Sequence, residues 1–262
     1  NTENTAHYIT DYQGQLLDAI LSELVELDNT SKLQIVQERR LLAEAGHVSY
    51  ADLLPVLDKL AKEESYLVVS QVVSALERFI DEGTEAEEAF NTLVAKLARH
   101  NYERLGFEAK DGESDEDELV RQLTISMMIR SNDEEASQVA SQIFAAHKEN
   151  LAGLPAAIRS QVLINEIKHH ETKELVATYL DLYTHATDAV FKRQLAAALA
   201  YSTDAENIQT LIATWKDKFV VKPQDLSAWY LQFLGHQATQ ETVWVWAREN
   251  WDWIKAALGG DM

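Results

Sequence analysis

Residues 172–203 read TKELVATYLDLYTHATDAVFKRQLAAALAYST, and the spacing of their apolar side chains decides the fold class. Two stripes recur at intervals of three and four residues, which places each stripe on one face of an α-helix. The stripes are Leu175, Val176, Tyr179, Leu180 and Tyr183, then Phe191, Leu195, Ala198 and Leu199. The stretch therefore predicts two amphipathic helices joined by a short turn.

The same pattern runs through almost the whole chain. Near the N-terminus, one buried stripe is predicted from Leu16, Leu17, Ile20, Leu21, Leu24 and Leu27. Helix starts are predicted, mostly about 16–17 residues apart, near Ser114, Ser131, Pro155, Thr172, Thr187 and Thr203. Two such helices make a unit of roughly 33–35 residues, the length of helical-hairpin repeats. We predict an all-α, right-handed α-solenoid of HEAT- or armadillo-like hairpins, with an irregular helical bundle as the alternative.

Local signals mark the ends of these helices. Capping boxes are predicted for Thr84 with Glu87, Ser131 with Glu134, and Thr203 with Glu206, with a weaker form at Ser49 with Asp52. Pro155 suits a first helical turn. Helices are expected to stop at Gly46, Gly83 and Gly106.

The first dozen residues depart from the helical pattern. His7, Tyr8, Ile9 and Thr10 are prone to form a strand and are too few for a helix. We predict that residues 1–12 are the end of a preceding β-domain or a linker strand, and that residues 13–262 form one helical-repeat domain. The first residue is not methionine, which suggests either processing or, as the favoured expectation, an excised fragment of a longer protein.

Composition excludes several classes of function. The 262 residues carry a formal net charge of −20, which disfavours nucleic acid and anionic membranes as partners. No apolar run reaches the ~18 residues that span a bilayer. Cysteine is absent, which rules out disulfides and thiolate chemistry and favours the cytoplasm.

No candidate cluster in the chain predicts catalysis or metal binding. His169-His170-Glu171 lacks the second histidine, four residues after the first, that a zinc-peptidase helix requires, so it is interpreted as polar surface. Five acids lie in residues 113–118, but they lack the spacing of an EF-hand loop. They are interpreted as a solvated loop in which Ser114 and the acids favour the start of the next helix.

All six tryptophans lie in the last fifth of the chain: Trp215, Trp229, Trp244, Trp246, Trp251 and Trp253. In one continuous helix, Trp244 would share a face with Trp251, and Trp246 with Trp253, since each pair is seven residues apart. Such a cluster either binds a partner or seals the last helices of the array. We favour sealing.

Several motifs together resemble the C-terminal helical domain of aminopeptidase N-type (gluzincin) zinc peptidases, the ERAP C-terminal-like domain. One motif is Leu105-Gly106-Phe107, Gly112-Glu113 and Leu119-Val120-Arg121, similar to the family's "L-G-W … G-E … L-R". The others are Leu33 to Val36 with Leu41 to Ser49, Gln224-Asp225 with Trp244 to Ile254, and His7 to Tyr12. Ile9 stands where the family usually has arginine.

The resemblance implies a zinc-dependent aminopeptidase, with the zinc, general base and amine-binding motif on an upstream thermolysin-like domain. Neither H-E-x-x-H nor G-A-M-E-N occurs here, so we expect no catalytic, cofactor-binding or metal residue in this piece and no activity from it alone. It would close over the active site, help to bind and size-select peptide, and have the upstream catalytic and β-domains and peptide substrates as partners. The alternatives are a stand-alone HEAT-like scaffold that binds a peptide or helix in its groove, and an independent helical enzyme.

Arg121 is the one candidate for a residue that faces substrate, because it matches the arginine of the family's "L-R". Its rigid fork of donors suits the C-terminal carboxylate of a peptide. The favoured alternative is an ion pair with Glu113 or Glu118 that fixes the loop to the next helix.

Overall fold

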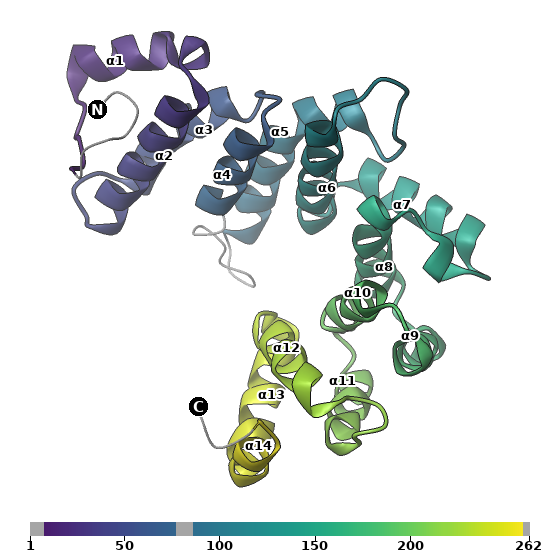
Figure 1. The fold of residues 1–262 in the computed structure, drawn as a ribbon. Coiled ribbons are helices and arrows are strands. Elements are labelled where there is room, and N and C mark those ends of the chain that lie inside the picture. The colour runs from purple at the N-terminus through teal and green to yellow at the C-terminus, as the bar shows by residue number, and fades with distance from the viewer. Residues whose placement is uncertain (1–7, 77–85, 259–262) are drawn as a thin grey trace. The chain divides into compact units, whose positions relative to one another are not determined.

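The structure is a computed structural model that describes residues 8–76 and 86–258. Helices are the only regular elements among these residues, and the chain is therefore all-α, as predicted (Figure 1). Packing divides the chain into two compact units, residues 1–136 and residues 137–262. Across the described ranges, every helix is too short or too polar to traverse a bilayer.

The first unit is built from neighbouring helices. Its elements are α1 (Gly14–Ser22), η2 (Leu24–Glu26), α2 (Asn29–Glu44), η3 (Tyr50–Leu53), α3 (Leu54–Leu60), α4 (Tyr66–Leu76), α5 (Glu87–Leu105) and α6 (Asp115–Arg130), where η marks a 3-10 turn. α4 packs on α2, α3 and α6, and α6 packs on α5. Each of these helices contacts the next one in the chain or the next but one, which is typical of stacked hairpins.

The second unit repeats this arrangement after α7 (Glu134–His147), which begins in the first unit. Its further elements are η5 (Leu151–Gly153), α8 (Ala156–His170), α9 (Lys173–His185), α10 (Ala189–Leu199), α11 (Ala205–Ala213), η6 (Thr214–Lys216), α12 (Pro223–Leu234), α13 (Gln237–Glu249) and α14 (Trp251–Leu258). α10 packs on α8, α9 and α12, and α12 packs on α13 and α14. The predicted array of helical hairpins is confirmed within each unit.

The strand predicted in the first dozen residues is not shown. Residues 8–13 have neither helix nor strand, and His7 lies outside the described residues. That residues 1–12 end a preceding domain, and that residues 13–262 form one domain, stay predictions.

Several helix ends are where the sequence predicts them. Ser49 and Ser114 each form a capping box, with Asp52 and Asp117 respectively. Thr172 caps α9. Gly46 and Gly106 follow the ends of α2 and α5 with φ of +74° and +57°, a conformation in which a side chain would be strained. Gly83 and Thr84 lie outside the described residues.

Two predicted caps are wrong. The carboxylate of Asp133, not Ser131, accepts the Ala136 amide in the first turn of α7, at 3.0 Å. Ser131 instead ends α6 and donates to the Met128 carbonyl. Asp204, not Thr203, caps α11. In both places an aspartate one or two residues further on accepts the amides more strongly than a hydroxyl, since its acceptor is charged.

The tryptophan cluster is divided by a break in the last helices. α13 ends before Asn250, so Trp244 and Trp251 do not share one continuous helix. Trp246 lies between Trp215 and Trp253, with ring centroids 5.1 and 5.9 Å away. Trp244 and Trp251 are about half exposed, at 55 % and 51 %. The ring contacts of Trp246 and Trp253 agree with sealing of the array, whereas the exposure of Trp244 and Trp251 does not; sealing stays a prediction.

The apolar stripe predicted for residues 16–27 is buried only at one point. α1 contains no buried residue, and Leu16 is 59 % exposed. Leu24 is fully buried, but it belongs to η2, because α1 ends at Ser22. The prediction of a single buried stripe is wrong for α1.

Candidate functional site

The motif around Arg121 occupies the turn from α5 to α6. α5 ends at Leu105, Gly106 reverses the chain, and Phe107 folds back so that its ring meets Tyr102 edge-on at 6.1 Å. Ser114 then caps α6 through its capping box with Asp117. Contacts made by Phe107 and Ser114 thus hold the loop at both of its ends.

An apolar cluster lies beside this turn. Val69 of α4, Leu105 of α5 and Val120 of α6 are all buried together, and Tyr66 and Leu123 pack against them. Burial of such side chains is the main source of stability at a helix junction. Leu105 and Val120 of the motif therefore join three helices.

The Arg121 side chain is 2 % exposed and is fixed by the loop. Its Nη2 donates to Oε2 of Glu113. This hydrogen bond lowers the pKa of the Glu113 carboxyl. Of the two partners predicted from the sequence, Glu113 is the one observed.

Arg104 and Asp117 form a second ion pair across the same turn. Nη1 of Arg104 donates to Oδ1 of Asp117 at 2.5 Å. The Ser114 amide, Arg104 and the Ser114 hydroxyl together lower the pKa of Asp117 to about 2. The carboxylate is therefore ionised at neutral pH, and the pair holds the C-terminal end of α5 on the first turn of α6.

The other acids of residues 113–118 belong mainly to the helix start. Residues 115–118 form the first turn of α6, where negative charge is favoured by the helix dipole. Oε2 of Glu116 also accepts the Tyr66 amide at 3.0 Å and so caps α4. Within residues 8–76 and 86–258, no group of three or more His, Asp or Glu side chains is placed to hold a metal ion.

Glu171 has a role that the sequence did not reveal. His169 and His170 are exposed, as expected for polar surface. Glu171, however, accepts hydrogen bonds from Ser202, from the Thr203 and Asp204 amides, and from Asn207 at the start of α11. Burial raises its pKa, but these hydrogen bonds outweigh burial and the net shift is downward. Its partners lie 31–36 residues away, so no local pattern marks it.

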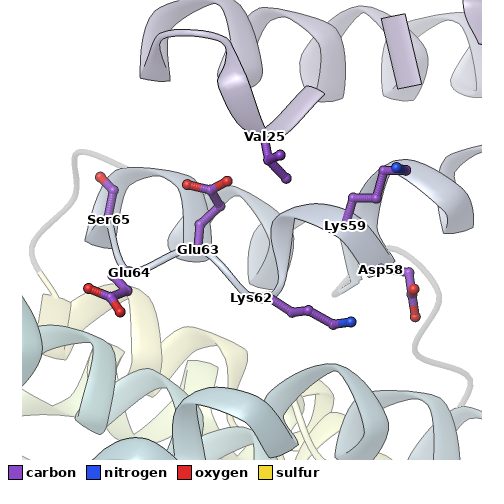
Figure 2. Close-up of a pocket in the computed structure, with 7 residues that line it drawn as sticks. All are labelled: Val25, Asp58, Lys59, Lys62, Glu63, Glu64 and Ser65. Atoms are coloured by element: carbon purple, nitrogen blue, oxygen red, sulfur yellow. The ribbon is translucent and has the colours of Figure 1, made fainter. Parts of the chain in front are cut away.

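A hollow of about 600 Å³ opens on the first unit between η2 and the end of α3. Figure 2 shows its lining: Val25, Asp58, Lys59, Lys62, Glu63, Glu64 and Ser65. Two of its acids already have cationic partners, since Lys96 binds Asp58 at 2.6 Å and Lys32 binds Glu63 at 2.9 Å. Side chains of both charge signs line the hollow. Its charge therefore favours neither a cationic nor an anionic ligand.

Comparison with known families assigns a family to the whole chain. The profile of the ERAP1-like C-terminal domain matches residues 1–262. The chain belongs to this family. The family resemblance deduced from the motifs is thereby confirmed, and the turn around Arg121 is a part of the ERAP1-like C-terminal domain.

Relatives of the whole chain are aminopeptidases. The chain is 53% identical to "Aminopeptidase N" of Lactococcus lactis subsp. lactis over 266 residues, which is 100% of this chain and 31% of that protein. It is 37% identical to "Aminopeptidase N" of Lactobacillus helveticus, again over 31% of that protein. "Aminopeptidase 2, mitochondrial" of Saccharomyces cerevisiae is 21% identical over 96% of this chain. The chain spans about a third of the length of these relatives.

Proposed function

We propose that this chain is the C-terminal domain of a zinc-dependent aminopeptidase, which removes N-terminal residues from peptides. In this proposal the domain has no catalytic residue of its own. It closes over the active site, helps to bind the peptide and limits the size of the substrate. The observation that carries the proposal is the match of the whole chain to a part of the aminopeptidase N relatives.

The catalytic groups are assigned to the chain upstream. The described residues offer no cluster for a metal ion, and no H-E-x-x-H occurs in the sequence. Zinc, the general base and the amine-binding groups would then belong to preceding thermolysin-like and β-domains. A helical wall that closes on such a site excludes water and bulky folded substrates.

Charge and composition agree with this role. The net charge of −20 favours the approach of basic peptides and of free amino groups by a general field effect. The absence of cysteine suits a reducing compartment, and we assign the enzyme to the cytoplasm.

The test compares residues 1–262 with the full-length protein. The full-length protein should release the chromophore of an aminoacyl-anilide, should lose this activity with a zinc chelator and should regain it with added zinc. Residues 1–262 alone should give a helical circular dichroism spectrum and no hydrolysis with or without zinc. Hydrolysis by the purified fragment, or a full-length protein that is inert with zinc, would contradict the proposal.

Arg121 is proposed to position the loop on α6 and not to bind peptide. The alanine variant Arg121→Ala should lower the melting temperature of the full-length enzyme, because the guanidinium is almost fully buried against Glu113. The KM values for a peptide and for an aminoacyl-anilide should stay in the same ratio. The carboxylate of the peptide is missing from the anilide, so a KM that rises only for peptides would show that Arg121 binds substrate.

A double-mutant cycle with Glu113→Gln supplies the control. If the two side chains act as a pair, Arg121→Ala should cost less stability in the Glu113→Gln background than in the wild type. Equal costs in both backgrounds would mean that Arg121 stabilises the fold through other contacts.

A further inference from the structure

The first helix carries an apolar face that the described chain covers only in part. Leu16, Leu17, Ile20 and Leu21 lie on one side of α1, since they are spaced by one and four residues. Leu16 is 59 % exposed, and the other three are only partly buried. We call these four residues the α1 face.

Unlike α2, α3 and α4 of the same unit, α1 contains no buried residue. The first described residues add two more exposed apolar side chains, Tyr8 at 54 % and Ile9 at 52 %. The main neighbour of α1 is the short turn η2 that follows it. A helix with a regular apolar stripe normally buries that stripe, and contiguous exposed apolar surface marks an interaction site.

The α1 face belongs to the first helix of the domain, and this position indicates what covers it. The matched region is the C-terminal third of the Lactococcus aminopeptidase N, so about two thirds of that protein precede it. Residues 8–13 lead directly into α1. A preceding domain would therefore be joined next to the α1 face.

The two residues that lie shortly before α1, Asp11 and Tyr12, are also held in place. Nη1 of Arg39, a nearly buried residue of α2, donates to the Tyr12 carbonyl at 3.2 Å and to Oδ1 of Asp11 at 3.4 Å. These contacts hold the last residues before α1 against α2. Asp11 and Tyr12 are thus fixed on α2 at the point where the chain enters α1.

We propose that the α1 face is the docking surface for the upstream part of the same polypeptide. This inference rests on the proposed function, because it requires the preceding domains. It adds that the apolar contact on α1, together with the Arg39 anchor, attaches the helical domain to the rest of the enzyme.

Cysteine labelling in the full-length protein tests the proposal. Residues 1–262 contain no cysteine, so Leu16→Cys introduces a unique site in this region, and mass spectrometry of the peptide that contains it reports its reaction with a maleimide. Asp18→Cys is the matched control, because Asp18 lies on the opposite, exposed side of the same helix. For each variant, the rate in native protein is compared with the rate in urea.

We expect native structure to slow labelling of Leu16→Cys at least about tenfold more than labelling of Asp18→Cys, because only the former site is covered by a stable interface. Similar rates at the two sites would overturn the proposal. Protection that disappears on dilution would also overturn it, since a second copy of the protein would then be the occupant.

Hydrogen exchange of the unmodified full-length protein gives a readout that needs no variant. Amides of residues 16–22 should exchange more slowly in the full-length protein than in residues 1–262, while amides of α12 should not differ. The outcome is separable from that of the proposed function. An active aminopeptidase without this protection contradicts the docking surface alone, and an inert protein with protection contradicts the proposed activity alone.

Discussion

Replacing Trp215 by alanine should lower the free energy of unfolding by about 3–5 kcal/mol, the usual cost of removing a fully buried tryptophan. Trp215 is 1 % exposed and lies among aromatic rings of two other elements, α12 and α13. Its ring meets Trp246 at 5.1 Å, Phe233 at 5.4 Å and Trp229 at 6.4 Å, all close to perpendicular or inclined. Alanine would leave a cavity between η6, α12 and α13 that these rigid rings fill poorly.

Trp244→Ala is the matched control for this prediction. Trp244 is 55 % exposed, so its replacement should change stability by no more than about 0.5 kcal/mol. Urea unfolding followed by far-ultraviolet circular dichroism compares the two variants without relying on tryptophan fluorescence, which both substitutions alter. A shift of the midpoint for Trp244→Ala as large as that for Trp215→Ala would mean that the exposed tryptophans also seal the array.

Asn101→Ala should be the second most damaging single change, with an expected cost of about 1–3 kcal/mol for each buried carbonyl left without a partner. Asn101 of α5 is fully buried, and its Nδ2 donates to the Ala61 carbonyl at 3.1 Å and to the Glu63 carbonyl at 2.9 Å. Its Oδ1 accepts from Nε of Arg104. One side chain thus satisfies the end of α3 and orients the arginine that pairs with Asp117.

The control for Asn101 is Asn91→Ala in the same helix, at a site that is only partly buried. Alanine improves helix propensity at both positions by up to about 0.7 kcal/mol, so the difference between the two variants isolates the buried hydrogen bonds. Urea unfolding of each variant measures this difference, provided that the free energy of unfolding falls with urea concentration at the same slope in both. If the two variants unfold at the same urea concentration, the carbonyls at the end of α3 find water in place of Asn101.

The helices and many of their ends were predictable from the sequence because they depend on residues within four positions of each other. Apolar spacing predicts α9 and α10 directly. Ser114 with Asp117 and the positive φ of Gly106 are equally local. These signals work because the helix repeats every 3.6 residues and its end groups are satisfied by the nearest side chains.

The same locality explains where the interpretation of the sequence failed. A hydroxyl at Thr203 and a carboxylate at Asp204 compete for the same amides, and spacing does not decide between them. The helix breaks at Asn250 although the seven-residue spacing of the tryptophans suits one continuous helix. Spacing also does not show that Trp244 and Trp251 are about half exposed. The partly covered stripe on α1 has the same periodicity as the buried stripes, because periodicity defines a face and not its neighbour.

The sequence by itself determined the fold class, many of the places where helices begin and end, and the family, because each of these is encoded in short segments of the chain. Only the tertiary structure decided that Arg121 pairs with Glu113 and not with Glu118. The same holds for the hydrogen bonds from Asn101 to the end of α3 and from the start of α11 to Glu171. The choice of Glu113 over Glu118 depends on the path of the loop between α5 and α6. The contacts of Asn101 and Glu171 depend on how the helices stack, because their partners are more than 30 residues away. The free energy of such a contact depends on burial and on a fixed approach of two segments, and neither is defined until the helices have packed.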